Sequence, residues 1–117
     1  MLTPLEKAVL DLMVDKPGEP FETVRQQLAY VRFANRKTTG VGFFTHFVVP
    51  VDAPVRRDLP NMEITGISAS FPDVQHGAGF ILFIRDGVVS FLEGFTYDDP
   101  WPEKTDEFTL SKVGVSK

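Results

Sequence analysis

The sequence predicts one small α+β domain in which two N-terminal helices pack on a mixed or antiparallel sheet of about five strands. The spacing of hydrophobic residues follows a helical period of about 3.6 as far as residue 31 and a strand period of about 2 after it. A single Asp-Gly dipeptide between two apolar runs marks a β-hairpin. The length of 117 residues, of which 43% are hydrophobic and 24% charged, is typical of one folded domain spanning residues 1–117.

The first helix is expected to begin after Thr3, because Thr3 and Glu6 can form a capping box and Pro4 suits the first helical position. Its buried stripe follows helical spacing: Leu5, Ala8, Val9, Leu12 and Met13. The run 16–18 (KPG) ends it. A second amphipathic helix is expected from about Pro20, with one apolar face made by Phe21, Val24, Leu28 and Val31.

Two segments after the helices have the composition of strands. Residues 41–50 (VGFFTHFVVP) and 62–71 (MEITGISASF) are rich in aromatic and β-branched residues, and Gly66 marks a bulge or a close approach in the second. The connection between them contains two prolines and is expected to be irregular. The C-terminal run 108–115 (FTLSKVGV) alternates weakly and is predicted to form an edge strand.

The clearest local signal is the hairpin GAGFILFIRDGVVSFLEGF, with Asp86-Gly87 as a two-residue type I′ turn. Uninterrupted pairing from this turn places Leu82 opposite Phe91 and Phe80 opposite Glu93. Both faces of the hairpin are then apolar, which is typical of strands covered on both sides. Two helices can cover one face, so a loop or a partner subunit is expected to cover the other.

The predicted core draws on both helices and on every strand of the hairpin region. The echo between 40–44 (GVGFF) and 77–81 (GAGFI) also suggests two strands that begin with similar glycine geometry and lie as neighbours. The residues expected in the core are Leu5, Val9, Leu12, Val24, Leu28, Phe43, Phe47, Ile64, Phe80, Leu82, Ile84, Val89, Phe91 and Phe95.

Composition excludes several classes of function. The net charge of −4 opposes binding to the phosphates of a nucleic acid. No apolar run is long enough to cross a bilayer, and the first residues lack the basic region of a signal peptide. The absence of cysteine excludes disulfides and thiolate zinc sites and suits a cytoplasmic location. No cofactor is expected, because neither Gly-x-Gly segment continues as a dinucleotide or phosphate-binding motif.

Three residues are weak candidates for catalysis: His46, His76 and Glu93. Together they could hold a metal that activates water, or His76 and Glu93 could act as an acid–base pair. No metal-ligand or nucleophile motif supports this grouping. The simpler interpretation, which we favour, is a histidine bonded within a strand and a glutamate solvated at a sheet edge.

The best candidate for a binding surface is the loop with Tyr97, Asp98, Asp99 and Trp101. Tyrosine and tryptophan supply rigid contact area with a polar group and are enriched where proteins meet. The alternative is a strap in which Trp101, the only tryptophan, packs back over the open side of the sheet and completes a core.

Residues 38–47 (TTGVGFFTHF) and above all 76–103 (HGAGFILFIRDGVVSFLEGFTYDDPWPE) resemble a family of small uncharacterised bacterial α+β proteins. The shared features are a G-x-G-F strand, a D-G hairpin and an L-E-G-[FY]-[TS]-[YF] strand that leads into a P-W-P loop. The resemblance covers about half of the chain and implies no activity. Some such proteins resemble components of toxin–immunity neighbourhoods, where an acidic single domain blocks a partner.

Taken together, these patterns predict a non-catalytic module that binds a protein partner or a second copy of itself, with an immunity-like role as one form of this. The alternative is a small metal-dependent or acid–base hydrolase that uses His46, His76 and Glu93. The two hypotheses differ in geometry, because the hydrolase requires the three side chains to converge on one cleft.

Overall fold

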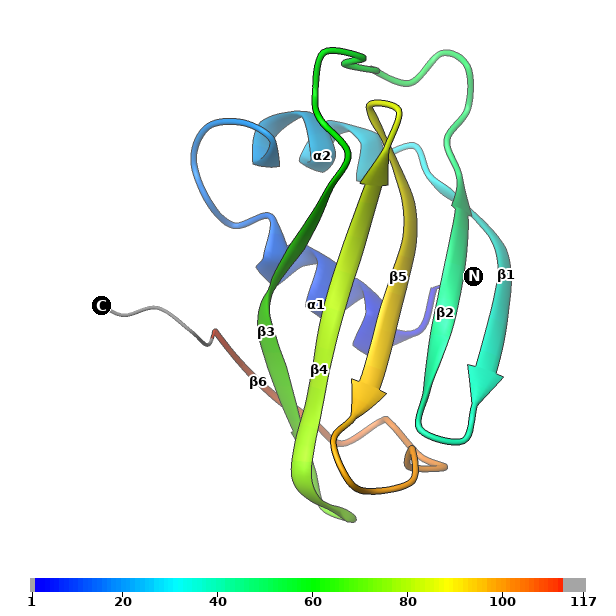
Figure 1. Ribbon diagram of the computed structural model, residues 1–117, viewed down its shortest axis with the longest axis vertical. Helices are drawn as coiled ribbons and strands as arrows, with labels where there is room; N and C mark the ends of the chain where they lie inside the picture. Colours follow the sequence, from blue (N-terminus) through cyan, green and yellow to red (C-terminus); the bar gives the residue numbers. More distant parts are fainter. Residues whose placement is uncertain (1, 113–117) are drawn as a thin grey trace.

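The computed structural model describes residues 2–112, and in it two helices lie against one face of a six-stranded sheet (Figure 1). The helices are α1 (Pro4–Met13) and α2 (Phe21–Leu28); the strands are β1 (Arg32–Thr39), β2 (Gly42–Val48), β3 (Met62–Phe71), β4 (Val74–Arg85), β5 (Val88–Thr96) and β6 (Thr109–Lys112). The spatial order is β1-β2-β5-β4-β3-β6, and each neighbouring pair is antiparallel. The α+β class and the N-terminal helices are confirmed, with six strands in the described range instead of about five.

The helix signals read from the sequence are present. The hydroxyl of Thr3 accepts from the backbone N–H of Glu6 at 3.1 Å, and the Glu6 carboxylate accepts from the backbone N–H of Thr3 at 2.7 Å. Arg25 on α2 donates to the carbonyl oxygens of Val14 and Lys16 at 2.6 and 2.7 Å. Backbone acceptors just beyond the end of α1 are therefore satisfied by a side chain of α2, which ties the two helices together.

Buried polar side chains attach each helix to the sheet. On α2, the Gln27 amide donates to the Gly87 carbonyl at 2.7 Å and accepts from the Val89 N–H at 2.8 Å. On α1, the Glu6 carboxylate accepts from the Arg36 guanidinium of β1 and from the Thr45 hydroxyl of β2. These bonds satisfy polar groups that would be costly to bury alone.

Most strands lie where the sequence predicted them. β3 has the predicted bounds, with its bulge at Gly66, where φ is 99°. β2 lies inside the predicted segment 41–50, and β6 forms the expected edge strand as far as Lys112; the rest of that prediction, 113–115, lies outside the described residues. β1 was not predicted.

The Asp86-Gly87 turn is confirmed, since φ is 55° and 80° at its two residues, as a type I′ turn requires. The predicted register is wrong beyond the first two pairs. A bulge at Ser90 shifts β5 by one residue, so Phe91 lies opposite Phe83 and not opposite Leu82. Because side chains alternate between faces, this single extra residue moves the rest of β5 to the opposite face.

The helix-side core lies between the helices and the sheet, and its buried members come from both layers. They are Leu5, Val9, Leu10, Met13, Val14, Val24, Phe43, Ile64, Ile67, Ala69, Phe71, Val74, Ala78, Phe80, Leu82, Ile84, Val89 and Leu92. Leu12, Leu28 and Phe47 pack against them, as predicted. Phe91 and Phe95, also predicted to be core residues, do not belong to this group, because the bulge turns them away from the helices.

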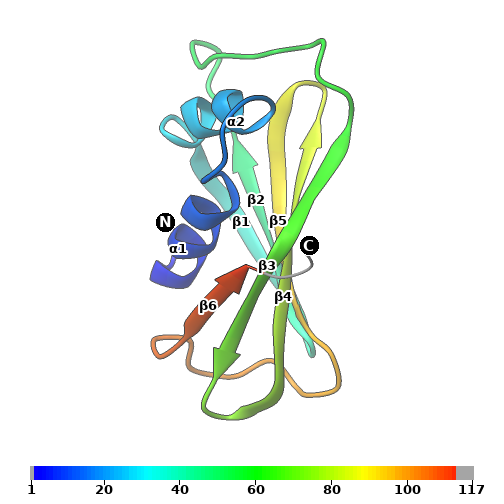
Figure 2. The same cartoon turned by 90° about the vertical axis from the view of Figure 1, so that its left-hand side faces the viewer.

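The molecule has only two layers. Its principal extents are 40 × 36 × 20 Å, and 20 Å accommodates one helix layer on one sheet. Seen from the side, both helices lie on the same side of the sheet, and no helix formed by residues 2–112 covers the other side (Figure 2). The sheet therefore has an inner face, packed on the helices, and an outer face without a second layer.

Candidate functional site

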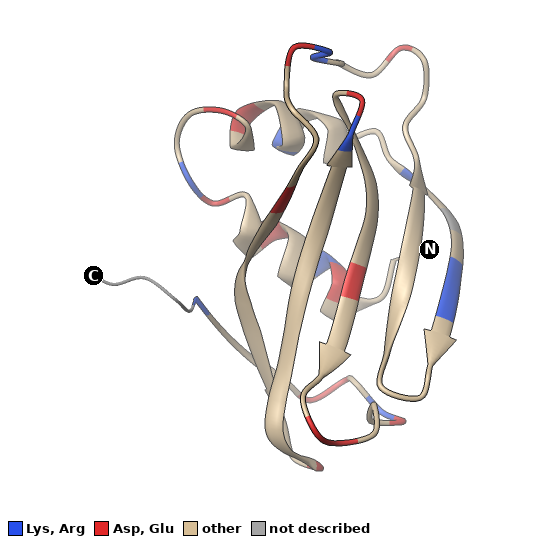
Figure 3. Ribbon diagram, in the orientation of Figure 1, with Lys and Arg blue, Asp and Glu red and all other residues tan. Residues whose placement is uncertain are grey.

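The outer face of the sheet is apolar at its centre. Four phenylalanines and an isoleucine project from it and are only partly buried, and none belongs to the helix-side core. We call these residues the outer aromatic face: Phe44, Ile81, Phe83, Phe91 and Phe95. β2, β4 and β5 together carry only two Asp, Glu, Lys or Arg residues, Arg85 and Glu93, so this region is nearly free of charge (Figure 3).

The rings of the outer aromatic face contact one another across three strands. Phe83 of β4 stacks on Phe91 of β5, with centroids 4.2 Å apart and an interplanar angle of 16°. On the other side of Phe91 lie Phe44 at 6.0 Å and His46 at 5.2 Å, both from β2. Such cross-strand pairs stabilise a sheet modestly and also produce a continuous, rigid apolar surface.

Phe95 extends this surface between two glycines. It lies opposite Gly42 of β2 and Gly79 of β4, the second glycine of each Gly-x-Gly-Phe segment noted in the sequence. A Cβ added at Gly79 would lie 2.8 Å from the Phe95 ring, so the ring covers this glycine. The prediction that these two segments form neighbouring strands is wrong, because β5 lies between them.

Glu93 lies in the middle of the outer aromatic face. Its direct neighbours across the strands are Ile81 on β4 and Phe44 on β2. Burial among these apolar groups raises the pKa of the Glu93 carboxyl above its ordinary value. His46, opposite Phe91, is its diagonal neighbour on the same face. Within the described residues, the side chains of Glu93 and His46 make no hydrogen bond and no ion pair.

Charged residues surround the apolar centre. Arg85 pairs with Glu63 of β3 at 3.0 Å, and its guanidinium lies 5.2 Å from the centroid of Phe83. On the opposite side Lys37 of β1 is paired with Phe44 and so shares its face. An apolar centre with a polar rim is the usual anatomy of a protein interface.

Replacement of Glu93 by glutamine is expected to stabilise the isolated domain by up to about 1 kcal/mol at neutral pH. The folded state binds the Glu93 proton more tightly than the unfolded chain does, so the ionised carboxylate lowers stability once the pH exceeds the folded pKa. The gain from Glu93→Gln should vanish as the pH falls below about 4, where both states are protonated. Urea unfolding of dilute protein at both pH values measures it.

Glu63→Gln is the matched control for this effect, because Glu63 lies on the same face but is paired with Arg85. It should leave the stability unchanged or slightly lower it. A Glu93→Gln variant that loses stability at neutral pH would contradict the assignment of a desolvated carboxylate.

The predicted catalytic set is not assembled. His46 and Glu93 share the outer face, but His76 lies near the beginning of β4, where it contacts Asp99 of the loop after β5. The backbone N–H of His76 donates to the Asp99 carboxylate at 3.2 Å, and Nδ1 lies 3.5 Å from the same oxygen. Among residues 2–112, no three His, Asp or Glu side chains are grouped so that they could hold a metal ion.

The predicted recognition loop divides between two sides of the molecule. Trp101 packs edge-on against Phe43 and Phe71, with centroids 5.1 and 5.7 Å away, and so completes the helix-side core without covering the outer face. Tyr97 is 57% exposed and packs edge-on against Phe95 at 5.6 Å, which places it beside the outer aromatic face. Asp98 is exposed, and Asp99 holds His76.

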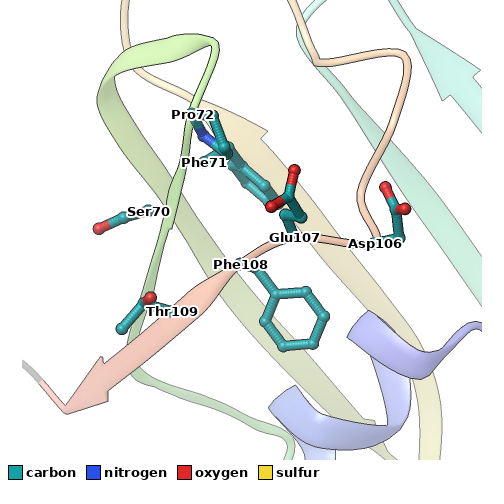
Figure 4. A pocket seen from close by; sticks show the side chains of 7 residues that line it. All are labelled: Ser70, Phe71, Pro72, Asp106, Glu107, Phe108 and Thr109. Carbon is teal, nitrogen blue, oxygen red and sulfur yellow. The ribbon is translucent and has the colours of Figure 1, made fainter.

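A separate cleft of about 530 Å³ lies between the end of β3 and the segment that leads into β6 (Figure 4). Its lining residues are Ser70, Phe71, Pro72, Asp106, Glu107, Phe108 and Thr109. The lining contains carboxylates and hydroxyls but no histidine or lysine that could act as a base for those hydroxyls. It has no complete set for nucleophilic catalysis.

No protein-family model, curated protein or solved structure matches this chain. In the described part of the chain, no helix combines the length and the apolar character needed to span a membrane.

The outer aromatic face is not evident from the sequence, because an unbroken hairpin places its members on both faces, with Phe91 and Phe95 in the core. The alternation Phe44-His46-Val48 separates one outward stripe of β2. No residue type at Ser90 marks the bulge, so the matching stripe of β5 could not be identified in the same way.

Proposed function

We propose that this domain is a non-catalytic protein-recognition module and that the outer aromatic face is its binding surface. The observation that carries the proposal is a sheet that is apolar on both faces but has helices on only one. Antiparallel sheets with one solvated face ordinarily alternate apolar and polar residues, which keeps the outer side polar. Five large apolar side chains on an open face are typical of an interaction site.

The composition of the surface agrees with this role. Phenylalanine is enriched and charged residues are depleted at the centres of interfaces, as they are on β2, β4 and β5. The rings are already held by stacking within the sheet, so little side-chain freedom is lost when a partner binds. Tyr97, one of the four residues proposed from the sequence, extends the surface at one end.

An immunity-like role, in which the domain blocks a partner, is one form of this proposal and is supported only by the resemblance of residues 76–103. The hydrolase is not proposed, because it requires His76 to converge with His46 and Glu93. His76 lies instead near the beginning of β4, against Asp99. The broad apolar surface is suited to another folded protein.

Adjacent residues of β5 provide a test of whether the outer face serves binding or folding. Phe91 points outward and Leu92 inward, where it is 0% exposed. Leu92→Ala should lower the free energy of unfolding by about 3–4 kcal/mol. Phe91→Ser, and the pair Phe83→Ser with Phe91→Ser, should cost no more than about 1.5 kcal/mol, the worth of a surface aromatic pair.

The same variants test binding. Wild-type protein and the Phe83→Ser/Phe91→Ser variant are compared as immobilised baits, and any protein retained only by the wild type is purified and titrated against both by calorimetry. The expected result is a measurable affinity that the double variant loses. Outer-face substitutions that destabilise the domain as much as Leu92→Ala would assign this face a structural role. Binding that is unchanged in the double variant would show that the partner does not bind this face.

A further inference from the structure

Resting on the proposed function, we infer that the partner on the outer aromatic face is a second copy of this chain, packed sheet against sheet. In this arrangement Glu93 of each copy meets His46 of the other. Three features carry the inference: the charge balance of the face, the positions of two unpaired polar side chains, and the size of the surface.

The charge balance favours a second copy over an oppositely charged partner. The chain as a whole carries −4, so two copies repel one another on average. The outer face and its rim carry Arg32, Lys37 and Arg85 against Glu63 and Glu93, three positive charges against two negative. Because the outer face is close to neutral, two copies can pack through it with less repulsion than through the rest of their acidic surface.

The centre of the face needs a polar partner that the same face can supply. A sheet packed over Glu93 removes water from a carboxylate that has no side-chain partner among residues 2–112, and burial without a hydrogen bond is strongly unfavourable. His46 is a donor at the diagonal position on the same face, and its side chain too lacks a hydrogen bond in the part of the chain that the structure describes. An imidazole donates to a carboxylate through one ring nitrogen when neutral and through both when protonated.

The positions of these residues suit two-fold symmetry. Phe91 lies opposite His46, and Phe44 lies opposite Glu93, so the four side chains form a parallelogram across β2 and β5. A two-fold axis lying between the two sheets near the Phe44–Phe91 diagonal brings His46 of each copy within side-chain reach of Glu93 of the other. Each copy then supplies one histidine and one glutamate, which gives two identical pairs around a phenylalanine centre, as in an isologous dimer.

The surface is large enough for such a dimer. In spatial order the five strands β1, β2, β5, β4 and β3 lie about 4.8 Å apart, which gives a width of roughly 24 Å. The nine residues of β5 give a length of roughly 30 Å, so the face measures about 700 Å². Stable protein interfaces bury roughly 600–1,000 Å² on each partner, so this face lies within the usual range. Sheets that pack face to face, aligned or orthogonal, interdigitate their side chains as these aromatic rings would.

The decisive experiment exchanges the two polar residues between copies. Sedimentation velocity of the wild type from about 1 μM to about 1 mM should show a reversible dimer. Glu93→His and His46→Glu alone place like groups together and should each weaken the dimer by at least roughly tenfold. An equimolar mixture of the two variants restores both His–Glu pairs and should dimerise with nearly the wild-type affinity. Circular dichroism establishes that both variants are folded.

A second measurement is independent of the folding of those two variants. Since the chain has no cysteine, Phe44→Cys introduces one thiol close to the proposed axis, and oxidation should cross-link two copies. Tyr30→Cys, exposed just after α2, is the control and should remain monomeric.

The outcomes separate the two proposals. A wild type that stays monomeric to about 1 mM and no cross-link at Phe44→Cys overturn the second copy as partner. The recognition surface would still stand if Phe83→Ser/Phe91→Ser abolished binding to a different protein. A wild-type dimer that the mixture fails to restore overturns the His46–Glu93 pairing, and a dimer unaffected by Phe83→Ser/Phe91→Ser overturns the outer face as the binding surface.

Discussion

Replacement of Glu6 by glutamine is expected to lower the free energy of unfolding by about 2–4 kcal/mol at neutral pH. The Glu6 carboxylate is 1% exposed and receives the Arg36 guanidinium through two bonds of 2.8 and 2.5 Å. It also accepts from the Thr45 hydroxyl and from the Thr3 backbone. Glutamine removes the charge that Arg36 faces and turns one acceptor into a donor, so at least one bond is lost beside a partly buried cation.

This loss should depend on pH in a defined direction. Burial by itself would raise the pKa of Glu6, but the hydrogen bonds from Arg36, Thr45 and Thr3 outweigh it and hold this pKa below its ordinary value. A carboxyl whose folded pKa is lowered adds stability above its unfolded pKa, near 4.5, and loses it as the pH falls through the folded value. Wild type and Glu6→Gln should therefore converge in acid.

Urea unfolding at neutral pH and below about pH 3 measures both effects. Glu22→Gln is the control, since Glu22 is an exposed acid in the first turn of α2. It should change the stability by less than about 0.5 kcal/mol. A Glu6→Gln variant as stable as the control would mean that the Arg36 contact does not hold α1 on the sheet.

The parts of the fold that the sequence predicts are those with local chemical causes. The capping box at Thr3, the type I′ turn at Asp86-Gly87 and the bulge at Gly66 each follow from what one or two residue types do to the backbone. The helix positions follow in the same way from a single apolar stripe.

β1 illustrates what local signals miss. Its sequence, RFANRKTT, carries three charges and has no apolar alternation, so nothing in it separates a strand from a loop. It is a strand because its residues pair with β2 along its length and because Arg36 reaches the buried Glu6 carboxylate. Charged residues on an edge strand also discourage pairing with other chains.

The candidate site depends on an irregularity of the same kind. Glu93 stands out in the sequence as a carboxylate among apolar residues, and the structure places it so. Which apolar residues surround it depends on the bulge at Ser90, which no residue type signals. The register of an unbroken hairpin therefore places Phe91 and Phe95 in the predicted core, and it does not reveal the open apolar surface.

Gly42→Ala is expected to destabilise the domain by about 3 kcal/mol or more, the upper range for forcing atoms into a packed structure. A Cβ at Gly42 would lie 2.0 Å from the carbonyl oxygen of Gly94 and 3.0 Å from the Cα of Phe95. Both are backbone atoms of the neighbouring strand, which no rotamer change can move aside. β2 and β5 would have to separate where Thr96 donates its N–H to the Val41 carbonyl at 2.8 Å.

Gly40→Ala, two residues earlier, is the matched control, since a Cβ there meets no atom within 4 Å. It should leave the free energy of unfolding unchanged or raise it by up to about 1 kcal/mol, because alanine lowers the conformational entropy of the unfolded chain. Thermal or urea unfolding of the two variants, read against the wild type, separates close strand packing from a general effect of glycine. Equal stabilities for Gly40→Ala and Gly42→Ala would show that β2 and β5 do not approach this closely. Because Gly42 lies opposite Phe95, a separated pair would also displace that ring, so Gly42→Ala should weaken association through the outer aromatic face as well.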